Sequence, residues 1–193
     1  MSHSIRPRWK LVLTGAAALL LASCASPPLT LYTLGTSPAS DAVPLGARPV
    51  VIAIARVTMP DDLDTEDIVV RDGSTLRRST KGRWASRLSL GITDRLTQRL
   101  AERRPDALVT DRPLSDTPTD RIQVNIGRLD VTSAGIATLD ADWMIVPRNP
   151  RVPTRRDRGH FTASGPVATD ADVVALLGKV LDQLAAAMKI GGR

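Results

Sequence analysis

The sequence is poor in the residues that catalytic, metal and nucleic-acid sites commonly use. Its 193 residues include one cysteine, Cys24, and two histidines, and aromatic residues make up 3% of the chain. A lone cysteine excludes an internal disulfide framework and a cysteine-rich metal cluster. The scarcity of aromatic side chains excludes a row of base-stacking platforms for single-stranded nucleic acid. These absences remove several large classes of function.

Signatures of catalysis are also missing. The chain has no Gly-x-Ser-x-Gly elbow, no Walker loop and no dinucleotide-binding glycine pattern. His160 is the one histidine after Cys24, and it stands beside Gly159 at the start of a predicted strand. A general base at this position competes with a solvated histidine near an arginine-rich loop, and we favour the latter. The sequence therefore predicts a protein that is not an enzyme and that binds no cofactor, and no residue is assigned as a metal ligand.

The N-terminal segment has the organisation of a bacterial lipoprotein signal. Three basic residues precede an apolar run, Leu11–Ala22, which is too short to span a bilayer. The small residue Ser23 follows, and then Cys24, whose sulfur is the expected site of lipidation. An ordinary secretory signal with an incidental cysteine is the alternative. We predict cleavage before Cys24 and an N-terminal lipid anchor, which is stable when two or three acyl chains are attached.

Composition divides the chain into three segments. Residues 1–23 are the predicted signal peptide, residues 24–48 a lipid-anchored flexible tether rich in Pro, Ser, Thr and Gly, and residues 49–193 a single periplasmic domain. The signal segment holds three of the 26 basic residues and none of the 20 acidic ones, so its removal lowers the formal net charge from +6 to +3. This excess is too small for the dense basic face of a nucleic-acid-binding protein.

Hydrophobic periodicity predicts the elements of that domain. Alternating or β-branched runs indicate strands at residues 50–57, 68–71, 75–77, 107–109, 121–132, 136–146 and 156–164, with Asp72-Gly73 as a hairpin turn. Two amphipathic helices are expected, one over residues 84–103 and one after Thr169. The order of these elements predicts an α+β fold, in which an antiparallel or mixed β-sheet is covered on one face by two amphipathic helices.

Particular residues define the two helices and the core. Apolar side chains recur at four-residue spacing in the first helix, at Trp84, Leu88, Ile92, Leu96 and Leu100. In the second helix, Thr169 is the expected N-cap, Asp172 its capping-box partner, and Gly191-Gly192 the expected end. Trp143 is in phase with the inward-facing residues of its strand, so we expect it in the core.

Two charged clusters are candidate binding sites. The acidic cluster has five carboxylates in seven positions, at Asp61, Asp62, Asp64, Glu66 and Asp67. It lacks the turn glycine and distal glutamate of an EF-hand, so a hard-cation site, a partner site and a solvated loop all remain open. The basic cluster contains Arg148 and the four residues that we expect to contact a partner or a lipid headgroup, Arg151, Arg155, Arg156 and Arg158. A soluble charged loop is the alternative for this cluster.

The order of the motifs resembles one protein family. The resemblance rests on Tyr32-Thr33-Leu34, the strand Val51–Val57, Met59-Pro60-Asp61-Asp62-Leu63-Asp64 with Ile68-Val69-Val70-Arg71, Arg83-Trp84-Ala85 with Leu88, Arg121–Val124 through Leu129-Asp130, and Leu139–Trp143. Together these are similar to the PqiC/YmbA-like family, the auxiliary lipoproteins of ABC-type intermembrane transport systems built around MCE-domain proteins. The chain departs from the family pattern at Met59 and Asp62, where leucine and tyrosine are more usual.

The resemblance implies a location, partners and a role. It implies a lipid-anchored protein on the periplasmic face of the outer membrane of a Gram-negative bacterium, whose partners are an MCE-domain protein and the associated permease and ATPase. Ala25 follows Cys24 in place of the aspartate that retains lipoproteins at the inner membrane, which agrees with outward sorting. A homo-oligomer is left open. The rival hypotheses are a periplasmic lipid or glycan hydrolase that uses the acidic cluster, and a pilot or assembly lipoprotein for another outer-membrane machine.

Overall fold

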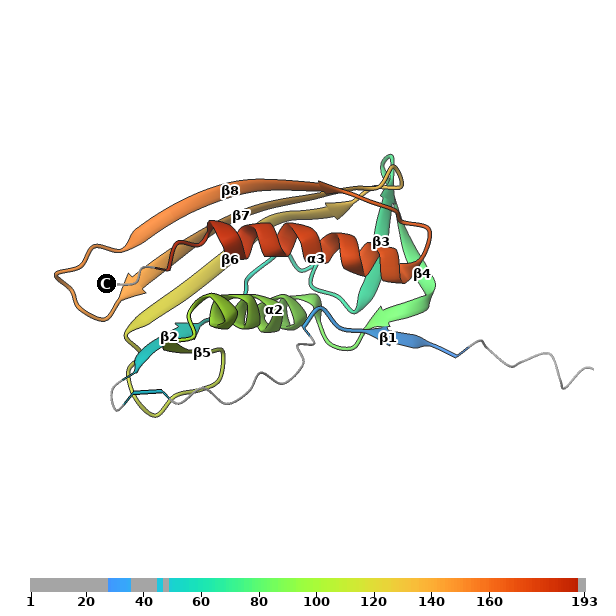
Figure 1. Cartoon of the computed structure of the whole chain (residues 1–193). Helices are drawn as coiled ribbons and strands as arrows, with labels where there is room; N and C mark the ends of the chain where they lie inside the picture. The colour runs from blue at the N-terminus through green and yellow to red at the C-terminus, as the bar shows by residue number, and fades with distance from the viewer. Residues whose placement is uncertain (1–27, 36–44, 47–48, 191–193) are drawn as a thin grey trace, which may run out of the picture.

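The fold combines two β-sheets with two helices (Figure 1). The computed structural model describes residues 28–35, 45–46 and 49–190. Cys24, with the predicted signal peptide and most of the predicted tether, lies outside the described residues. No helix in the described ranges is both long enough and apolar enough to cross a membrane.

The larger sheet has five strands in the order β5-β2-β6-β7-β8. Its strands are β2 (Val50–Ile54), β5 (Ala107–Thr110), β6 (Asp120–Val131), β7 (Ile136–Pro147) and β8 (Arg155–Ser164). Strand β2 is parallel to both β5 and β6, whereas β6, β7 and β8 form an antiparallel meander. The sheet is therefore mixed, one of the two predicted options, and the predicted pairing of residues 121–132 with 136–146 is confirmed.

The smaller sheet has three strands in the order β1-β4-β3. Strand β3 (Asp67–Asp72) and strand β4 (Thr75–Trp84) form the predicted hairpin, and β1 (Thr30–Tyr32) is parallel to β4. Asp72 pairs with Thr75, so the turn is Gly73-Ser74, one residue later than expected. Gly73 has φ +60°, a conformation that glycine adopts without the steric cost of a Cβ atom.

The first helix, α2 (Leu88–Arg103), begins four residues later than the apolar spacing predicts. Trp84 is the last residue of β4 because its backbone N–H donates to the Glu66 carbonyl. The next N–H, of Ala85, donates to the Tyr32 carbonyl, so both amides are already used by the smaller sheet. The predicted start at Trp84 is therefore wrong, although all five apolar residues of the spacing are buried.

The second helix, α3 (Asp170–Ala187), begins as predicted with a capping box at Thr169. Thr169 Oγ1 accepts the Asp172 N–H at 3.2 Å, and the Thr169 N–H donates to the Asp172 carboxylate at 2.9 Å. These bonds satisfy backbone N–H groups that have no partner within the helix. The helix ends at Ala187, whereas Gly191-Gly192 lies outside the described residues.

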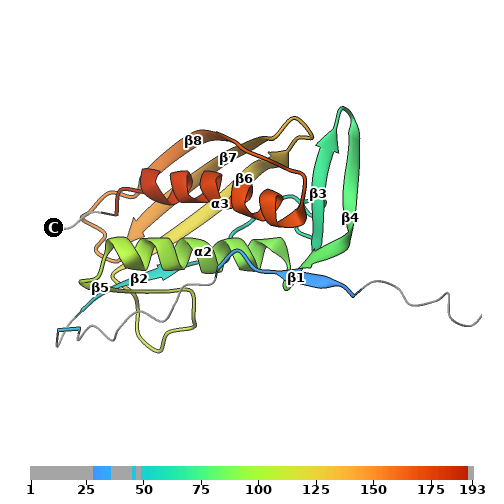
Figure 2. The same cartoon turned by 45° about the vertical axis from the view of Figure 1, so that its right-hand side comes forward.

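Both helices cover one face of the larger sheet, as Figure 2 shows. The largest fully buried side chains of the core come from both layers and include Ile52, Ile122, Ile126 and Leu139 from strands and Ile92, Leu96, Leu181 and Leu184 from helices. On β6 and β7, inward-facing apolar residues alternate with more exposed, mostly polar ones. The predicted α+β class is confirmed, and the separation of the strands into two sheets is an addition that periodicity alone does not reveal.

Candidate functional site

The acidic cluster lies in the connection between β2 and β3, beside the start of α2. The Asp64 carboxylate accepts the backbone N–H of Ser89 at 2.9 Å, in the first turn of that helix. Arg87, the N-cap residue, makes no side-chain capping bond. Asp64 therefore caps α2 from a distant loop and also suits the positive end of the helix dipole.

The electrostatic surroundings of Asp64 keep its carboxylate ionised. Burial favours the neutral acid, but hydrogen bonds from Ser89 and the charges of Arg56 and Arg87 outweigh it, so the pKa of Asp64 lies below its ordinary value. Arg56 lies 3.3 Å and Arg87 3.6 Å from the carboxylate. This carboxylate is thus already engaged in holding the loop against the helix.

Replacing Asp64 with asparagine should lower stability and flatten its dependence on acid pH. The lowered pKa means that the carboxylate stabilises the fold fully above its ordinary pKa of about 4, and that this stabilisation is lost as pH falls through the lowered pKa. We expect Asp64→Asn to cost about 1 kcal/mol at pH 7 and less at pH 3. Thermal melts at both pH values measure this loss of stability, and Asp62→Asn, at an exposed position, is the control. Equal losses in Asp64→Asn at pH 7 and pH 3 would contradict the prediction.

The remaining acidic residues diverge from one another. Asp67, the first residue of β3, pairs with Arg78 at 3.0 Å and also with Arg83. Asp61, Asp62 and Glu66 are exposed. Within the described ranges, no group of three or more His, Cys, Asp or Glu residues is arranged to hold a metal ion. The structure thus uses the two half-buried carboxylates as partners for arginines.

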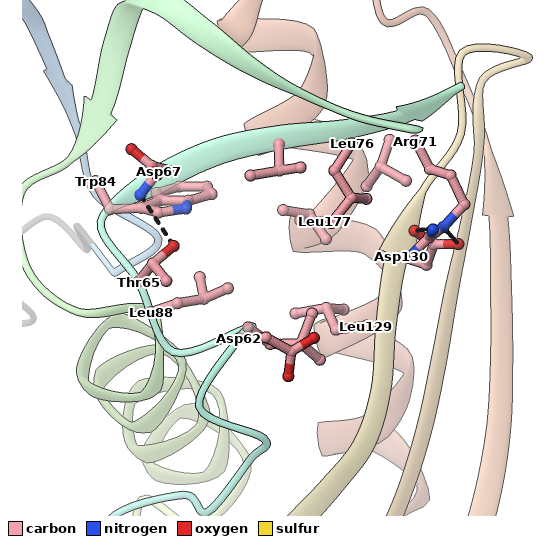
Figure 3. A pocket seen from close by; sticks show the side chains of 13 residues that line it. Asp62, Thr65, Asp67, Arg71, Leu76, Trp84, Leu88, Leu129, Asp130 and Leu177 are labelled. Carbon is pink, nitrogen blue, oxygen red and sulfur yellow. Dashed lines mark hydrogen bonds and ion pairs between the residues drawn. The ribbon is translucent and has the colours of Figure 1, made fainter. Parts of the chain in front are cut away.

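A small cavity lies where this loop passes between the two sheets (Figure 3). Its volume is about 60 Å³, and its apolar lining includes Trp84, Leu88, Leu129 and Leu177. Ligand pockets for small molecules generally measure about 300–1,000 Å³. The cavity is therefore too small for an acyl chain or a sugar.

An ion pair at the rim of the cavity joins the two sheets. The Arg71 Nε of β3 donates to both oxygens of Asp130 on β6, at 2.9 and 2.8 Å. The backbone contributes too, because the Ser133 N–H donates to the Arg71 carbonyl at 2.8 Å. The Asp130 side chain is only 8% exposed. The hairpin is thus fixed to the end of the larger sheet by both side-chain and main-chain bonds.

Removing the Arg71 guanidinium should weaken the junction between the sheets. Arg71→Ala leaves the buried Asp130 carboxylate with Arg128, 3.5 Å away, as its remaining cation. We expect a loss of about 1–3 kcal/mol in the free energy of unfolding, measured by urea titration. Arg77→Ala is the matched control in the same hairpin, since Arg77 is 71% exposed and pairs loosely with Asp72. A loss of similar size in both variants would argue against a specific junction.

A second set of ion pairs, which no sequence motif above predicted, joins the two helices and holds the segment that follows β1. Arg95 and Arg99 of α2 both bind Asp182 of α3, at 2.9 and 2.8 Å. Arg95 also donates to the Leu34 carbonyl at 2.7 Å. Burial opposes ionisation of Asp182, but the two guanidinium groups outweigh it and lower its pKa. The four-residue spacing of Arg95 and Arg99 is the signal that could have indicated a shared helix face.

The basic cluster lies at the other end of the larger sheet. Arg151 is in the β7–β8 loop, and Arg155, Arg156 and Arg158 begin strand β8; all four are exposed. Arg155 donates to the Lys189 carbonyl beyond α3. Arg156 and Arg158 have the opposite parity along the strand, so they face away from the helices. The sequence groups these arginines, and the strand divides them between two faces.

His160 lies on the same outer face as Arg156 and Arg158. Its Nδ1 atom contacts the Asp140 carboxylate of β7, and the imidazole side chain is 62% exposed. Asp142, two residues further along β7, is opposite Arg158 and accepts a hydrogen bond from Asn125 at 3.2 Å. These are cross-strand polar pairs of an exposed sheet face, and within the described part of the chain no hydroxyl or thiol is hydrogen-bonded to the histidine.

Comparison with known proteins identifies the family. The model of the ABC-type transport auxiliary lipoprotein component family matches residues 32–189. The chain belongs to this family. This assignment confirms the resemblance inferred from the sequence motifs, and the protein is therefore an auxiliary lipoprotein component of an ABC-type transport system. A comparison with curated proteins gives no match.

Solved structures that align with TM-scores above 0.5 have the same architecture. One crystal structure of an uncharacterized protein aligns with a TM-score of 0.65 at 18% identity, covering 82% of this chain and 95% of that one. A protein from Xanthomonas campestris aligns with a TM-score of 0.56 at 16% identity, covering 81% of this chain and 90% of that one. A weaker similarity, with a TM-score of 0.40 at 14% identity, is to the PelC dodecamer from Paraburkholderia phytofirmans, covering 72% of this chain and 91% of that one.

Proposed function

We propose that this family member is a non-catalytic docking subunit, anchored through Cys24 to the periplasmic face of the outer membrane, that holds the MCE-domain protein of an intermembrane lipid transport system. Residues 49–193 serve as its single periplasmic domain, and residues 24–48 connect that domain to the lipid. The observation that carries the proposal is the separation of β1 from the basic cluster, which lie at opposite ends of the molecule (Figures 1 and 2).

The position of β1 supports a defined orientation at the membrane. Five residues separate Cys24 from Thr30, the first residue of β1, and the six residue steps between these two span at most about 20 Å when fully extended. The strand itself is fixed, since β1 pairs with β4 and the Leu34 carbonyl is bound by Arg95. A lipid on Cys24 therefore holds the smaller sheet close to the membrane.

The same orientation favours one of the two interpretations of the basic cluster. The β7–β8 loop and the start of β8 lie at the end away from β1 (Figures 1 and 2). Arg151, Arg155, Arg156 and Arg158 then face the periplasm, beyond reach of the headgroups in which the anchor sits. Carboxylates of a periplasmic partner are the matching ligands for exposed guanidinium groups.

The hydrolase hypothesis receives less support from the same structure. It requires a free pair of carboxylates beside a substrate-sized cleft. Asp64 and Asp67 are each bound by two arginines, and the adjacent cavity holds about 60 Å³. A pilot lipoprotein for another outer-membrane machine fits the anchor and the fold equally, and its partner distinguishes it.

Copurification from cross-linked envelopes tests the docking function. We expect the tagged full-length protein to retain the MCE-domain protein and its transporter. Reversing the charge of two arginines, with Arg151→Glu and Arg156→Glu together, should reduce the recovery of these partners at least tenfold. Arg77→Glu with Arg78→Glu, which makes the same charge change at the opposite end, is the control and should retain the partner. Recovery of a different outer-membrane machine, or of no transporter component, would refute the proposal.

A further inference from the structure

Strand β8 has an open edge over half of its length. Among the strands that the structure describes, β8 is the last of the larger sheet and pairs only with β7. The Gly165 N–H donates to the Gly135 carbonyl at 3.0 Å, which continues the β7–β8 ladder and shows that odd-numbered residues direct their backbone groups toward β7. The backbone groups of even-numbered residues, including Arg156, Arg158 and His160, therefore point away from the sheet.

Helix α3 covers one half of this edge with long side chains. Lys179 donates to the Ser164 carbonyl at 3.5 Å, and Gln183 donates to the Thr162 carbonyl at 3.1 Å. One helical turn further on the same face, α3 carries Ala186 and Ala187, whose methyl groups cannot reach the strand edge. Among the described residues, none donates to or accepts from the edge-facing backbone of Arg156, Arg158 or His160. The edge is therefore covered at Thr162–Ser164 and open at Arg156–His160.

The open part of the edge lacks the usual features that terminate a sheet. It has no proline and no bulge in its register with β7, and ten residues are paired without interruption. Its protection is charge alone, from Arg156 and Arg158 on the outer face and the exposed Asp157 on the other face. This charge disfavours a second copy of β8, because two such edges would place arginine against arginine. It favours an added strand of opposite charge.

We propose that the edge of β8 from Arg156 to His160 binds an extended acidic segment of the partner protein by strand addition. Acidic residues at alternate positions of that segment would lie opposite Arg156 and Arg158, and the intervening small or apolar residues would lie beside Gly159 and Ala186. Main-chain hydrogen bonds supply affinity in this mode, and alternate side chains supply specificity. The inference rests on the proposed docking function and adds how the partner is held.

A labelled peptide tests the mode of binding without the native partner. The probe is a fluorescein-labelled peptide with the sequence Thr-Glu-Val-Glu-Val-Glu-Thr, titrated with the full lipidated protein in detergent and followed by anisotropy. We expect saturable binding of this peptide, and binding at least tenfold weaker when its glutamates are replaced by lysines or its central residue by proline. Equal binding of the three peptides would overturn strand addition by an acidic segment.

Proline substitutions at two edge positions provide a matched pair. His160→Pro removes an edge-facing N–H without breaking a β7–β8 ladder bond, so the sheet should persist while peptide affinity falls at least tenfold. Thr162→Pro makes the same change where α3 already covers the edge. His160→Ala removes the imidazole but keeps the backbone N–H. Both control variants should bind the acidic peptide with an affinity within twofold of wild type. An unchanged affinity in His160→Pro would refute the inference.

Two further measurements separate the possible failures. Arg156→Glu with Arg158→Glu changes only exposed side chains and should abolish binding of the acidic peptide even where a proline variant folds poorly. Sedimentation of the wild type and of His160→Pro measures whether β8 pairs with a second copy of the chain. If the wild type has the mass of an oligomer and His160→Pro has the mass of a monomer, the edge serves self-association, and the proposal of an acidic partner segment is overturned. If the peptide binds but copurification recovers no MCE-domain protein, the proposed function is refuted and strand addition is not. If the His160→Pro variant recovers the MCE-domain protein at wild-type levels, strand addition is refuted and the proposed function is not.

Discussion

Trp143→Ala is expected to remove about 3–5 kcal/mol from the free energy of unfolding, a large part of the total stability of a domain this size. Trp143 lies in the centre of β7, is 5% exposed, and packs against Phe161 of β8 with ring centroids 6.4 Å apart. Truncation leaves a cavity between the sheet and the helices because the neighbouring strands are fixed by their ladder bonds. Urea unfolding followed by circular dichroism measures the loss.

Trp143→Phe is the matched control for this loss. The indole Nε1 of Trp143 is buried and has no hydrogen-bond partner among the described residues, an arrangement that costs stability. Phenylalanine keeps an aromatic ring in the site and removes the unpaired donor, so its smaller volume is partly offset. We expect a change within about 1.5 kcal/mol of wild type. A Trp143→Ala variant with an unchanged melting temperature would show that the residue is not part of the core.

Cys24→Ala is expected to release the protein completely from the membrane while leaving the fold intact. The predicted attachment is the lipid on Cys24, because acyl chains hold a protein at a bilayer by burying their methylene groups, and alanine offers no sulfur to carry them. The contacts that join the two sheets are made by residues much further along the chain, such as Arg71 and Asp130, so we expect the fold to persist. Membrane fractionation and a thermal melt of the soluble form test both parts of the prediction.

The control for the anchor is a conservative change beside it. Ser23→Ala keeps a small residue before Cys24, so processing and membrane association should persist. Mass spectrometry of the N-terminal peptide identifies the acyl groups directly. A Cys24→Ala protein that still fractionates with outer membranes, or an unmodified N-terminal peptide in the wild type, would contradict the predicted lipidation.

Local patterns predicted the elements of the domain more closely than their junctions. The capping box at Thr169 and the alternation of β6 and β7 depend on neighbouring residues, so they are visible in the sequence. The start of α2 was misplaced because Trp84 fits the helical spacing, although its amide is held by Glu66 in the smaller sheet. A contact 18 residues away in the chain thus overrides a local pattern.

The candidate sites show the same division between sequence and structure. The arginines of the basic cluster are evident as a group, but their distribution over two faces depends on the parity of β8. The acidic cluster also appears uniform in the sequence, whereas burial next to α2 assigns Asp64 to a helix cap and leaves Asp61 exposed. The acidic residues can be counted in the sequence. Whether each carboxylate is free to bind a ligand depends on which arginines the fold places beside it.

The sequence alone determined the family of this protein, because the family is evident from an ordered set of local patterns, and each pattern depends on neighbouring residues. Only the tertiary structure decided that the strands form two sheets joined through Arg71 and Asp130, that β1 and the basic cluster lie at opposite ends, and that half of β8 has an open edge. These features arise from pairings between residues far apart in the chain, and hydrophobic periodicity carries no information about which distant segments pair.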